Sequence, residues 1–327
     1  MTLRFAFLVL ITLLTTIACD GDSDLQTAPT PMQTRVVVEG TPAQLSWSQK
    51  TPLPTPRSEV ASAVLDGKIY VIAGFRATGG SSDVVEVYDV AADRWERKEE
   101  LPEARDHAMA AAFGGKVYVF GGGLGNATRS VFAFDPARDA WSRMADMPHR
   151  RTAGGAAVLD DKIIVAGGTG DAPSETMVYD PAANRWSAGP PLPEPREHLG
   201  VTAAGGKIYV VGGRWNDVLK ANNEALDSLT GPWQRLAPMP TARGGTAAGS
   251  VNGRVYVAGG EAFGPSRTFE EVEVFDPASG TWSAAPDLPT PRHGLAVQGI
   301  GDVLFVIGGG PEAGLSVDPH NEALQTR

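Results

Sequence analysis

The 327-residue chain has one cysteine, few aromatic residues and too little positive charge to balance its acidic residues. A single thiol excludes an intrachain disulfide and any zinc site built on paired cysteines. The formal net charge of −10 makes nucleic acid an unfavourable partner. Glycine (39 residues) and proline (25 residues) are abundant, which favours many short strands and turns over helices.

The N-terminus is typical of an export signal. Arg4 precedes a mostly apolar, uncharged stretch of 13 residues, 5–17, which is too short to span a bilayer. The following Thr16-Ile17-Ala18-Cys19 resembles a bacterial lipobox, although Thr16 stands where that motif usually has leucine. The resemblance implies cleavage before Cys19 and lipidation of its thiol. Cleavage after Ala18 without lipidation, which would give a periplasmic or secreted protein, is the alternative.

We therefore predict three segments. Residues 1–18 are a signal peptide, and residues 19–43 hold the lipid-anchored Cys19 and a flexible, acidic, Thr/Pro-rich tether. Residues 44–327 form the folded domain. This organisation predicts a protein of the bacterial cell envelope that contacts the membrane through a lipid anchor only.

The folded domain repeats one pattern six times. Each unit has a tryptophan, an arginine 10 residues later within Leu/Met-Pro-x-x-Arg, and an apolar run that ends in a glycine 27 residues after the tryptophan. The tryptophans are Trp47, Trp95, Trp141, Trp186, Trp233 and Trp282; the arginines are Arg57, Arg105, Arg151, Arg196, Arg243 and Arg292; the glycines are Gly74, Gly122, Gly168, Gly213, Gly260 and Gly309.

The spacing after the glycine is variable. We assign the aspartate that closes the next strand to Asp89, Asp135, Asp180, Asp227, Asp276 and Asp318, which gives gaps of 15, 13, 12, 14, 16 and 9 residues. In the first five units, the next tryptophan follows that aspartate by six residues. All length variation therefore lies in one segment of the repeat.

We predict that each unit forms four short antiparallel strands, which we name A to D. Strand A is rich in small residues, as in 108–112 and 153–157, which suits the innermost position of a crowded sheet. Strand B is the apolar run before the glycines. Strand C ends in an aromatic residue and the aspartate, which caps the following turn. Strand D carries the tryptophan, which we expect to cover the seam between neighbouring units.

The double glycine, the aromatic-Asp pair and the tryptophan six residues later resemble the kelch repeat over residues 44–327. Ala73-Gly74 and Leu226-Asp227 depart from this pattern. The resemblance implies an all-β, six-bladed β-propeller. Only five units are followed by a strand D, so the strand around Trp47 must complete the last blade and close the ring. Deletion of 44–50 should open the ring, whereas deletion of 20–40 should not.

The variable loops between strands B and C share one face with the links from strand D to the next strand A. Length variation confined to one face of a repeat is typical of a binding face. Trp215 is the only tryptophan outside the repeat positions, and it either anchors a ligand or packs against its own loop. The ligand-binding candidates in these loops are Arg76, Arg129, Arg214, Trp215 and Arg267.

The links carry ionisable residues one and two positions after the repeat arginine. Glu59, His107 and Glu197 are acid/base candidates, and His198 and His293 are ligand-binding candidates. We expect Gly244, Gly245 and Gly294 to leave room beside them for a pocket. His149 lies beside a link as well. We expect no metal and no cofactor, because each histidine comes from a different unit, and we interpret the six repeat arginines as structural.

Three functions are compatible with the sequence. The first is a monomeric, non-enzymatic binding or scaffold module whose loop face takes a protein or a carbohydrate. The second, implied by the resemblance to exported bacterial kelch propellers, is a mutarotase or epimerase acting on a sialic-acid-like sugar, with Arg214 or Arg76 binding the acid. The third is a structural component of an envelope assembly. The copper-radical oxidase activity of some kelch proteins requires a cysteine–tyrosine crosslink, for which Cys19 is unsuitable.

Overall fold

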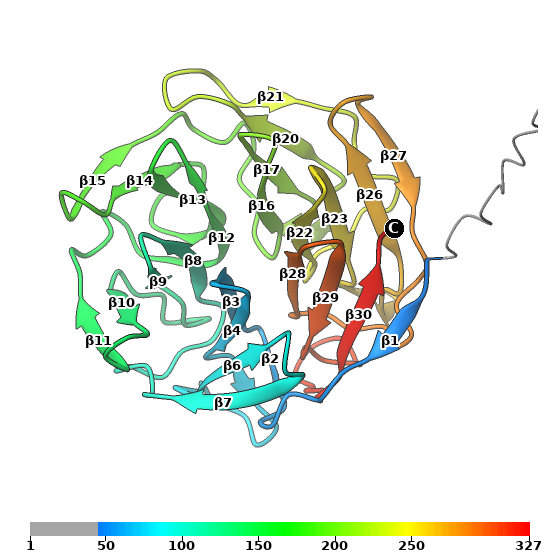
Figure 1. Cartoon of the computed structure of the whole chain (residues 1–327). Helices are drawn as coiled ribbons and strands as arrows, with labels where there is room; N and C mark the ends of the chain where they lie inside the picture. The colour runs from blue at the N-terminus through cyan, green and yellow to red at the C-terminus, as the bar shows by residue number, and fades with distance from the viewer. Residues whose placement is uncertain (1–44) are drawn as a thin grey trace, which may run out of the picture. The chain divides into compact units, whose positions relative to one another are not determined.

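The computed structural model describes residues 45–327, so the predicted signal peptide, Cys19 and the tether lie outside the described residues. Within 45–327 the secondary structure is entirely β, and this range contains no helix able to cross a membrane. Six four-stranded antiparallel sheets surround a central axis (Figure 1). The predicted all-β, six-bladed propeller is confirmed.

Each blade contains strands A to D in order. They are β3 (Ala61–Leu65), β4 (Lys68–Ile72), β6 (Val85–Asp89) and β7 (Arg94–Lys98); β8 (Met109–Phe113), β9 (Lys116–Phe120), β10 (Val131–Asp135) and β11 (Ala140–Arg143); β12 (Arg151–Leu159), β13 (Lys162–Gly170), β14 (Met177–Asp180) and β15 (Arg185–Ala188); β16 (Gly200–Ala204), β17 (Lys207–Val211), β20 (Asn223–Leu226) and β21 (Gln234–Arg235); β22 (Ala247–Val251), β23 (Arg254–Ala258), β26 (Val272–Asp276) and β27 (Thr281–Ala284); and β28 (Ala296–Ile300), β29 (Val303–Ile307), β30 (Asn321–Gln325) and β1 (Trp47–Gln49).

Three small two-stranded sheets lie outside the blades. Two are hairpins within the loops of blades four and five, and the third joins a link to the loop of blade one. They are β2 (Arg57–Ser58) with β5 (Phe75–Arg76), β18 (Arg214–Trp215) with β19 (Val218–Leu219), and β24 (Glu261–Phe263) with β25 (Ser266–Thr268). These short ladders give the loops on this face a defined backbone.

The innermost strands need small side chains because they approach one another closely. A Cβ atom on Gly155 in β12 would lie 2.4 Å from Cγ2 of Val201 in the neighbouring β16. Any larger residue would push these strands apart. The A strands line a central cavity of about 450 Å³. The prediction that the small-residue strands are innermost is confirmed.

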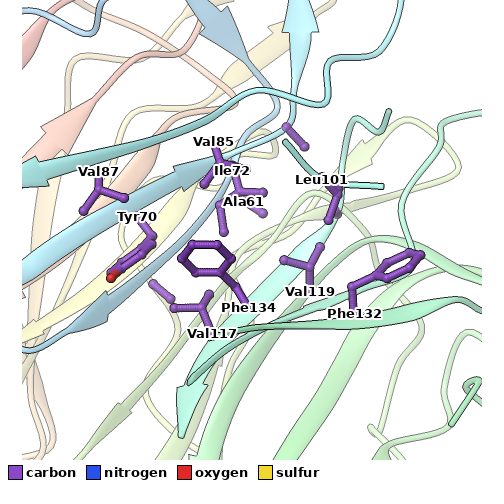
Figure 2. Close-up of a cluster of buried hydrophobic side chains, with 13 residues drawn as sticks. Ala61, Tyr70, Ile72, Val85, Val87, Leu101, Val117, Val119, Phe132 and Phe134 are labelled. Carbon is purple, nitrogen blue, oxygen red and sulfur yellow. The ribbon is translucent and has the colours of Figure 1, made fainter. Parts of the chain in front are cut away.

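The hydrophobic core is divided into six clusters, and each cluster lies between two adjacent blades. Figure 2 shows the cluster between blades one and two, where Tyr70 and Val87 face Phe134 and Val117. The rings of Tyr70 and Phe134 meet edge to face, with 6.1 Å between their centroids. Stability is therefore built from repeated interfaces between neighbours.

The N-terminal strand completes the last blade, as predicted. Trp47 and Gln49 in β1 pair with Leu324 and Glu322 in β30 (Figure 1). The indole Nε1 of Trp47 also donates a hydrogen bond to the carbonyl of Pro286 in the preceding blade, at 3.0 Å. The other repeat tryptophans donate in the same way to Thr51, Glu99, Ala145, Pro190 and Ala237. The predicted role of tryptophan at the seams is confirmed.

One sequence assignment is wrong. Asp318 does not close strand C of the last blade, because it precedes β30. Gln325 pairs with Val303 in the register that Asp89 adopts opposite Lys68 in the first blade. The loop before β30 therefore covers residues 308–320, similar in length to the other variable loops. The assignment failed because the last unit has Gln325 at the position where the other units have the aspartate that ends strand C.

Candidate functional site

The six repeat arginines hold the blades together. All six arginines are almost fully buried, with 0–2% of their surface exposed. Each guanidinium donates to the carbonyl of the residue just before the second glycine of its unit: Ala73, Gly121, Gly167, Gly212, Gly259 and Gly308. Four also bind a buried glutamate of strand C, in the pairs Arg57–Glu86, Arg196–Glu224, Arg243–Glu273 and Arg292–Glu322. These contacts support the structural interpretation of the arginines.

Two positions after each arginine, the links meet around the axis and form a belt of backbone hydrogen bonds. The belt residues are Glu59, His107, Ala153, His198, Gly245 and Gly294, and each has a left-handed backbone with φ between 51° and 64°. From His107 onward, the backbone amide of each belt residue donates to the carbonyl of the preceding belt residue, at 2.8–3.0 Å. The amide of Val60 donates to the carbonyl of Gly294 and so closes the belt. A left-handed backbone costs a non-glycine residue about 1–2 kcal/mol. Four belt positions thus carry a cost that glycine avoids, and the side chains at three of them, Glu59, His107 and His198, are polar.

Those three polar belt side chains converge. The Nε2 atoms of His107 and His198 are 2.9 Å apart, and Oε2 of Glu59 is 3.4 Å from Nε2 of His107. The two histidine rings are nearly perpendicular, at 75°. Both histidines are buried, and the Glu59 side chain is 11% exposed. Residues far apart in the sequence therefore form one polar cluster, which we call the axial cluster.

Carboxylates support the histidines from behind. Nδ1 of His107 contacts Oδ1 of Asp106 at 2.8 Å, and Nδ1 of His198 contacts a carboxylate oxygen of Glu197. Asp106 is held in turn by Ser81 and by the amide of Leu124. Each histidine thus presents Nε2 to the axis and Nδ1 to an acid.

The axial cluster continues through a second histidine–carboxylate group. Nδ1 of His293 is 3.1 Å from Oε1 of Glu59 and 3.5 Å from Oε2 of Glu261. Arg214 lies beside this group and donates to Glu197 at 2.9 Å and to Glu261 at 2.7 Å. The guanidinium of Arg214 is therefore occupied by two carboxylates and is 12% exposed, which leaves it poorly placed to bind a substrate acid.

Burial and charge shift the acidities of this cluster. Burial opposes ionisation of Glu59, but His107 and the hydrogen bond with His293 outweigh it and hold the Glu59 pKa well below its usual range. Burial, and to a lesser extent neighbouring positive groups, lowers the pKa of His198 well below its usual value. Burial also acts against the charge of His293, yet the contacts with Glu59 and Glu261 raise its pKa. Glu59 is ionised and His198 neutral at pH 7.

The expected room beside the link glycines is filled. A Cβ on Gly294 would lie 2.4 Å from Oε1 of Glu59, and one on Gly245 would lie 2.9 Å from Cγ of Glu261. A Cβ on Gly244 would meet Arg214 at 3.2 Å. The glycines make space for these side chains, so the room directly beside them is occupied. Gly245 and Gly294 nevertheless line the central cavity, together with Glu59, His107 and His198.

Two overlapping groups in the described part of the chain have a composition that suits a metal ion. One is Glu59, His107 and His198, and the other is Glu59, Glu261 and His293. Imidazole nitrogen and carboxylate oxygen are ligands for divalent zinc, iron, nickel and copper. His149 is not part of either group, since its Nε2 contacts Glu175 elsewhere, at 3.2 Å.

The remaining candidates lie outside the axial cluster, on the variable loops. Arg76 pairs with Asp83 at 2.7 Å, and Arg267 pairs with Glu271 at 2.8 Å. Arg129 is exposed, and Trp215 is half-buried opposite Val218 in the β18–β19 hairpin. The structure therefore separates the predicted residues into a buried axial group and an exposed loop group.

The same face carries the exposed apolar surface. We define the loop face as the D–A links with loops 73–84, 121–130, 171–176, 212–222, 259–271 and 308–320. Among residues 45–327, the exposed large hydrophobic side chains are Leu124, Val218, Phe263 and Leu315, at 50–61% exposure, and all four lie in these loops.

Sequence reasoning missed Glu261 as a site residue. Glu261 directly follows the second glycine of its unit, the position that Arg214 holds in the preceding unit. Residues at this position pair with the link, as Glu261 does with Gly244 and Arg214 with Glu197. The signal was therefore present in the repeat, one residue beyond the glycine pair.

Comparison with known proteins agrees with this architecture. The sequence matches the KLHDC2/KLHL20/DRC7 Kelch-repeats domain over residues 28–213. The chain belongs to the kelch-repeat family. The Kelch motif itself matches residues 195–240 and 242–289 of this kelch chain. No curated protein sequence matches it. The solved structure of YjhT is similar to it, with 19% sequence identity and a TM-score of 0.73 over 84% of this chain and 96% of that chain. At this identity the likeness shows the fold alone.

Proposed function

We propose that this protein is a binding or scaffold module of the cell envelope, and that its loop face docks a partner protein. The kelch propeller is compatible with such a scaffold. The observation that carries the proposal is the placement of Leu124, Val218, Phe263 and Leu315, which expose apolar surface on this face. Apolar side chains gathered on one face of a soluble domain are typical of a docking surface.

Part of this surface is continuous across blades. Gly314 of blade six lies beside Phe263 of blade five, since a Cβ atom added to this glycine would be 4.0 Å from the Phe263 ring. Gly79 of blade one lies beside Leu315 in the same way, at 3.9 Å. The guanidinium of Arg214 stacks over Phe263 at 5.1 Å. Loops from blades four, five, six and one therefore contribute to one patch, which we call the Phe263–Leu315 patch. Its partner should present apolar side chains.

Site-specific photo-crosslinking in intact cells tests this proposal. A photoreactive residue at Phe263 or Leu315 should give one discrete adduct, whose partner is then identified by mass spectrometry. The matched control is Ala137, in a turn between strands C and D on the other face, which should give no such adduct. Leu124→Ser should leave the fold intact and weaken the crosslink at Phe263 if the whole face is used.

Equal adducts at Ala137 and Phe263, or none at any loop position, would contradict docking at the loop face. The absence of adducts at every position would favour a purely structural role. A carbohydrate ligand would instead cover the photoreactive residues of the loop face, and no protein adduct would form.

The proposed location depends on Cys19. We propose that its thiol is lipidated and anchors a monomeric propeller at the membrane. Metabolic labelling with an alkyne fatty acid should label the wild-type chain and not the Cys19→Ser variant. That variant should also move from the membrane fraction to the soluble fraction. A labelled Cys19→Ser variant would contradict the lipid anchor.

A second candidate is isomerisation of a sugar acid. It is favoured by the ionised Glu59 and neutral His198, which line a central cavity large enough for a small ligand. The engagement of Arg214 by two carboxylates weakens it. Proton NMR of freshly dissolved sialic acid should show faster anomer exchange with the wild type than with Glu59→Gln, and equal rates would exclude this activity.

A further inference from the structure

The axial cluster poses a hydrogen-bonding problem. Ionised carboxylates accept hydrogen bonds and donate none, so Asp106 and Glu197 require a proton on Nδ1 of His107 and His198. With Nδ1 of each ring turned to a carboxylate, the two Nε2 atoms are turned toward each other and lie 2.9 Å apart.

Two buried ring nitrogens that face each other at hydrogen-bond distance share a positive centre, which is either a proton or a metal ion. Glu59 adds a third electron-rich atom to the same point, because its Oε2 lies 3.4 Å from Nε2 of His107. A metal ion with bonds of about 2.0–2.2 Å would hold its ligand atoms roughly 3–3.5 Å apart, close to the separations seen here.

We propose that the axial cluster binds one divalent first-row transition-metal ion through Nε2 of His107, Nε2 of His198 and a carboxylate oxygen of Glu59. Two imidazoles and one carboxylate form a three-ligand set that leaves a coordination position open. The central cavity reaches all three residues, so a small molecule has access to the ion.

The residues around the ligands support this assignment. Metal-bound histidines typically donate their second ring N–H to a carboxylate, which orients the ring and strengthens the ligand. Asp106 and Glu197 stand in this position for His107 and His198. Glu59 is oriented by His293 through its other oxygen. The three ligands also occupy belt positions with left-handed backbones where two other blades use glycine.

The second group is less suitable. Oε1 of Glu261 accepts from Arg214, and its Oε2 accepts from the amide of Gly314. Only Glu59 links the two groups. The proposal therefore assigns His293 and Glu261 to positioning Glu59 and keeps the ion at His107 and His198.

Metal titration of the purified full-length protein tests the site. The protein is prepared without a histidine tag, stripped with EDTA and titrated with ZnCl₂ in a calorimeter. Wild type should bind one equivalent, and His107→Ala or His198→Ala should weaken zinc binding at least 100-fold. Asp106→Asn should weaken it about 10- to 100-fold. Cobalt(II) should give visible absorption bands that these variants lose.

Matched controls keep the result interpretable. Ala153 occupies the belt position between the two histidines, so alanine is compatible with this backbone, and circular dichroism checks the fold of each variant. His149→Ala removes a histidine outside the cluster and should leave the titration unchanged. Less than one equivalent bound by wild type, or unchanged binding by His107→Ala, would overturn the proposal and indicate a shared proton between the imidazoles. Loss with His149→Ala would overturn it as well.

Discussion

The repeat arginines show how a single buried charge is made stable. The Arg292 guanidinium donates to the carbonyls of Gly308, Thr290 and Val306 and to the carboxylate of Glu322, and neither charged residue is exposed. The pair satisfies the donors of the guanidinium fork at the junction of strands B and C. Arg151 has no such direct ion pair, and burial lowers its pKa to about 10. The ion pair is therefore an accessory to the carbonyl contacts, which every blade has.

Arg292→Met should destabilise the fold by about 3–5 kcal/mol, because Glu322 would be left as an unpaired buried charge. Arg292→Met combined with Glu322→Leu should recover a large part of that loss. Urea unfolding followed by tryptophan fluorescence measures both. Arg143→Met at an exposed ion pair is the control and should change stability by less than about 1 kcal/mol. A double variant as unstable as the single one would contradict this account.

At the scale of elements, the turns between strands C and D of blades one, two and three bind the link that follows the preceding strand D. Asp93, Asp139 and Asn184 all have φ of 47–48°. Their side chains accept hydrogen bonds from the amides of Thr51, Glu99 and Ala145, at 2.8–3.0 Å. The same bond is thus made by two charged residues and one neutral residue.

Asp93→Asn should preserve stability at neutral pH and reduce its loss in acid. Hydrogen bonds from Tyr88 and Thr51 lower the pKa of Asp93 below 3.8. The folded-state pKa is depressed, so the stabilisation is present above the unfolded pKa and disappears as the pH falls through the folded value. Thermal melts between pH 5 and pH 2 measure the difference.

Asn184→Asp is the matched reverse change, because Tyr179 donates to Asn184 as Tyr88 donates to Asp93. It should make stability more sensitive to acid. Parallel melting curves for wild type and both variants over this pH range would argue against the assignment.

At the scale of the molecule, ring closure depends on one short strand. β1 supplies the fourth strand of the last blade, and Leu45 and Trp47 pack on the cluster between blades five and six. Without it, β30 becomes an open edge with unpaired backbone groups. The six inter-blade clusters support one another only while the ring is closed.

Deletion of residues 44–50 should lower the melting midpoint by at least about 10 °C, since each kcal/mol corresponds to roughly 2–4 °C in a domain of this size. It should also produce oligomers through the open edge of β30. Calorimetry and size-exclusion chromatography measure these effects, and a peptide of residues 44–52 added in trans should partly restore the midpoint. Removal of Arg327, which follows β30, is the control. An unchanged midpoint after deletion of 44–50 would show that closure does not require this strand.

The architecture follows from the sequence alone. Every unit encodes its own strands within about 50 residues, so spacing counted from Trp47 to Arg292 was enough to predict six blades, ring closure and one variable face. The failure at Asp318 is informative, since a single missing aspartate moved the expected end of the last strand C away from Gln325. The repeat spacing predicts the ends of strands reliably only in units that keep the residues marking those ends.

The geometry of the site depends on how the blades pack together. Glu59, His107 and His198 come from three blades, and the two histidines are 91 residues apart in sequence. Their distances, and the occupation of the space beside Gly245 and Gly294 by other side chains, depend on the radius of the belt and on the directions of side chains in six links. No local pattern encodes these quantities, because they arise when separate blades meet at one axis.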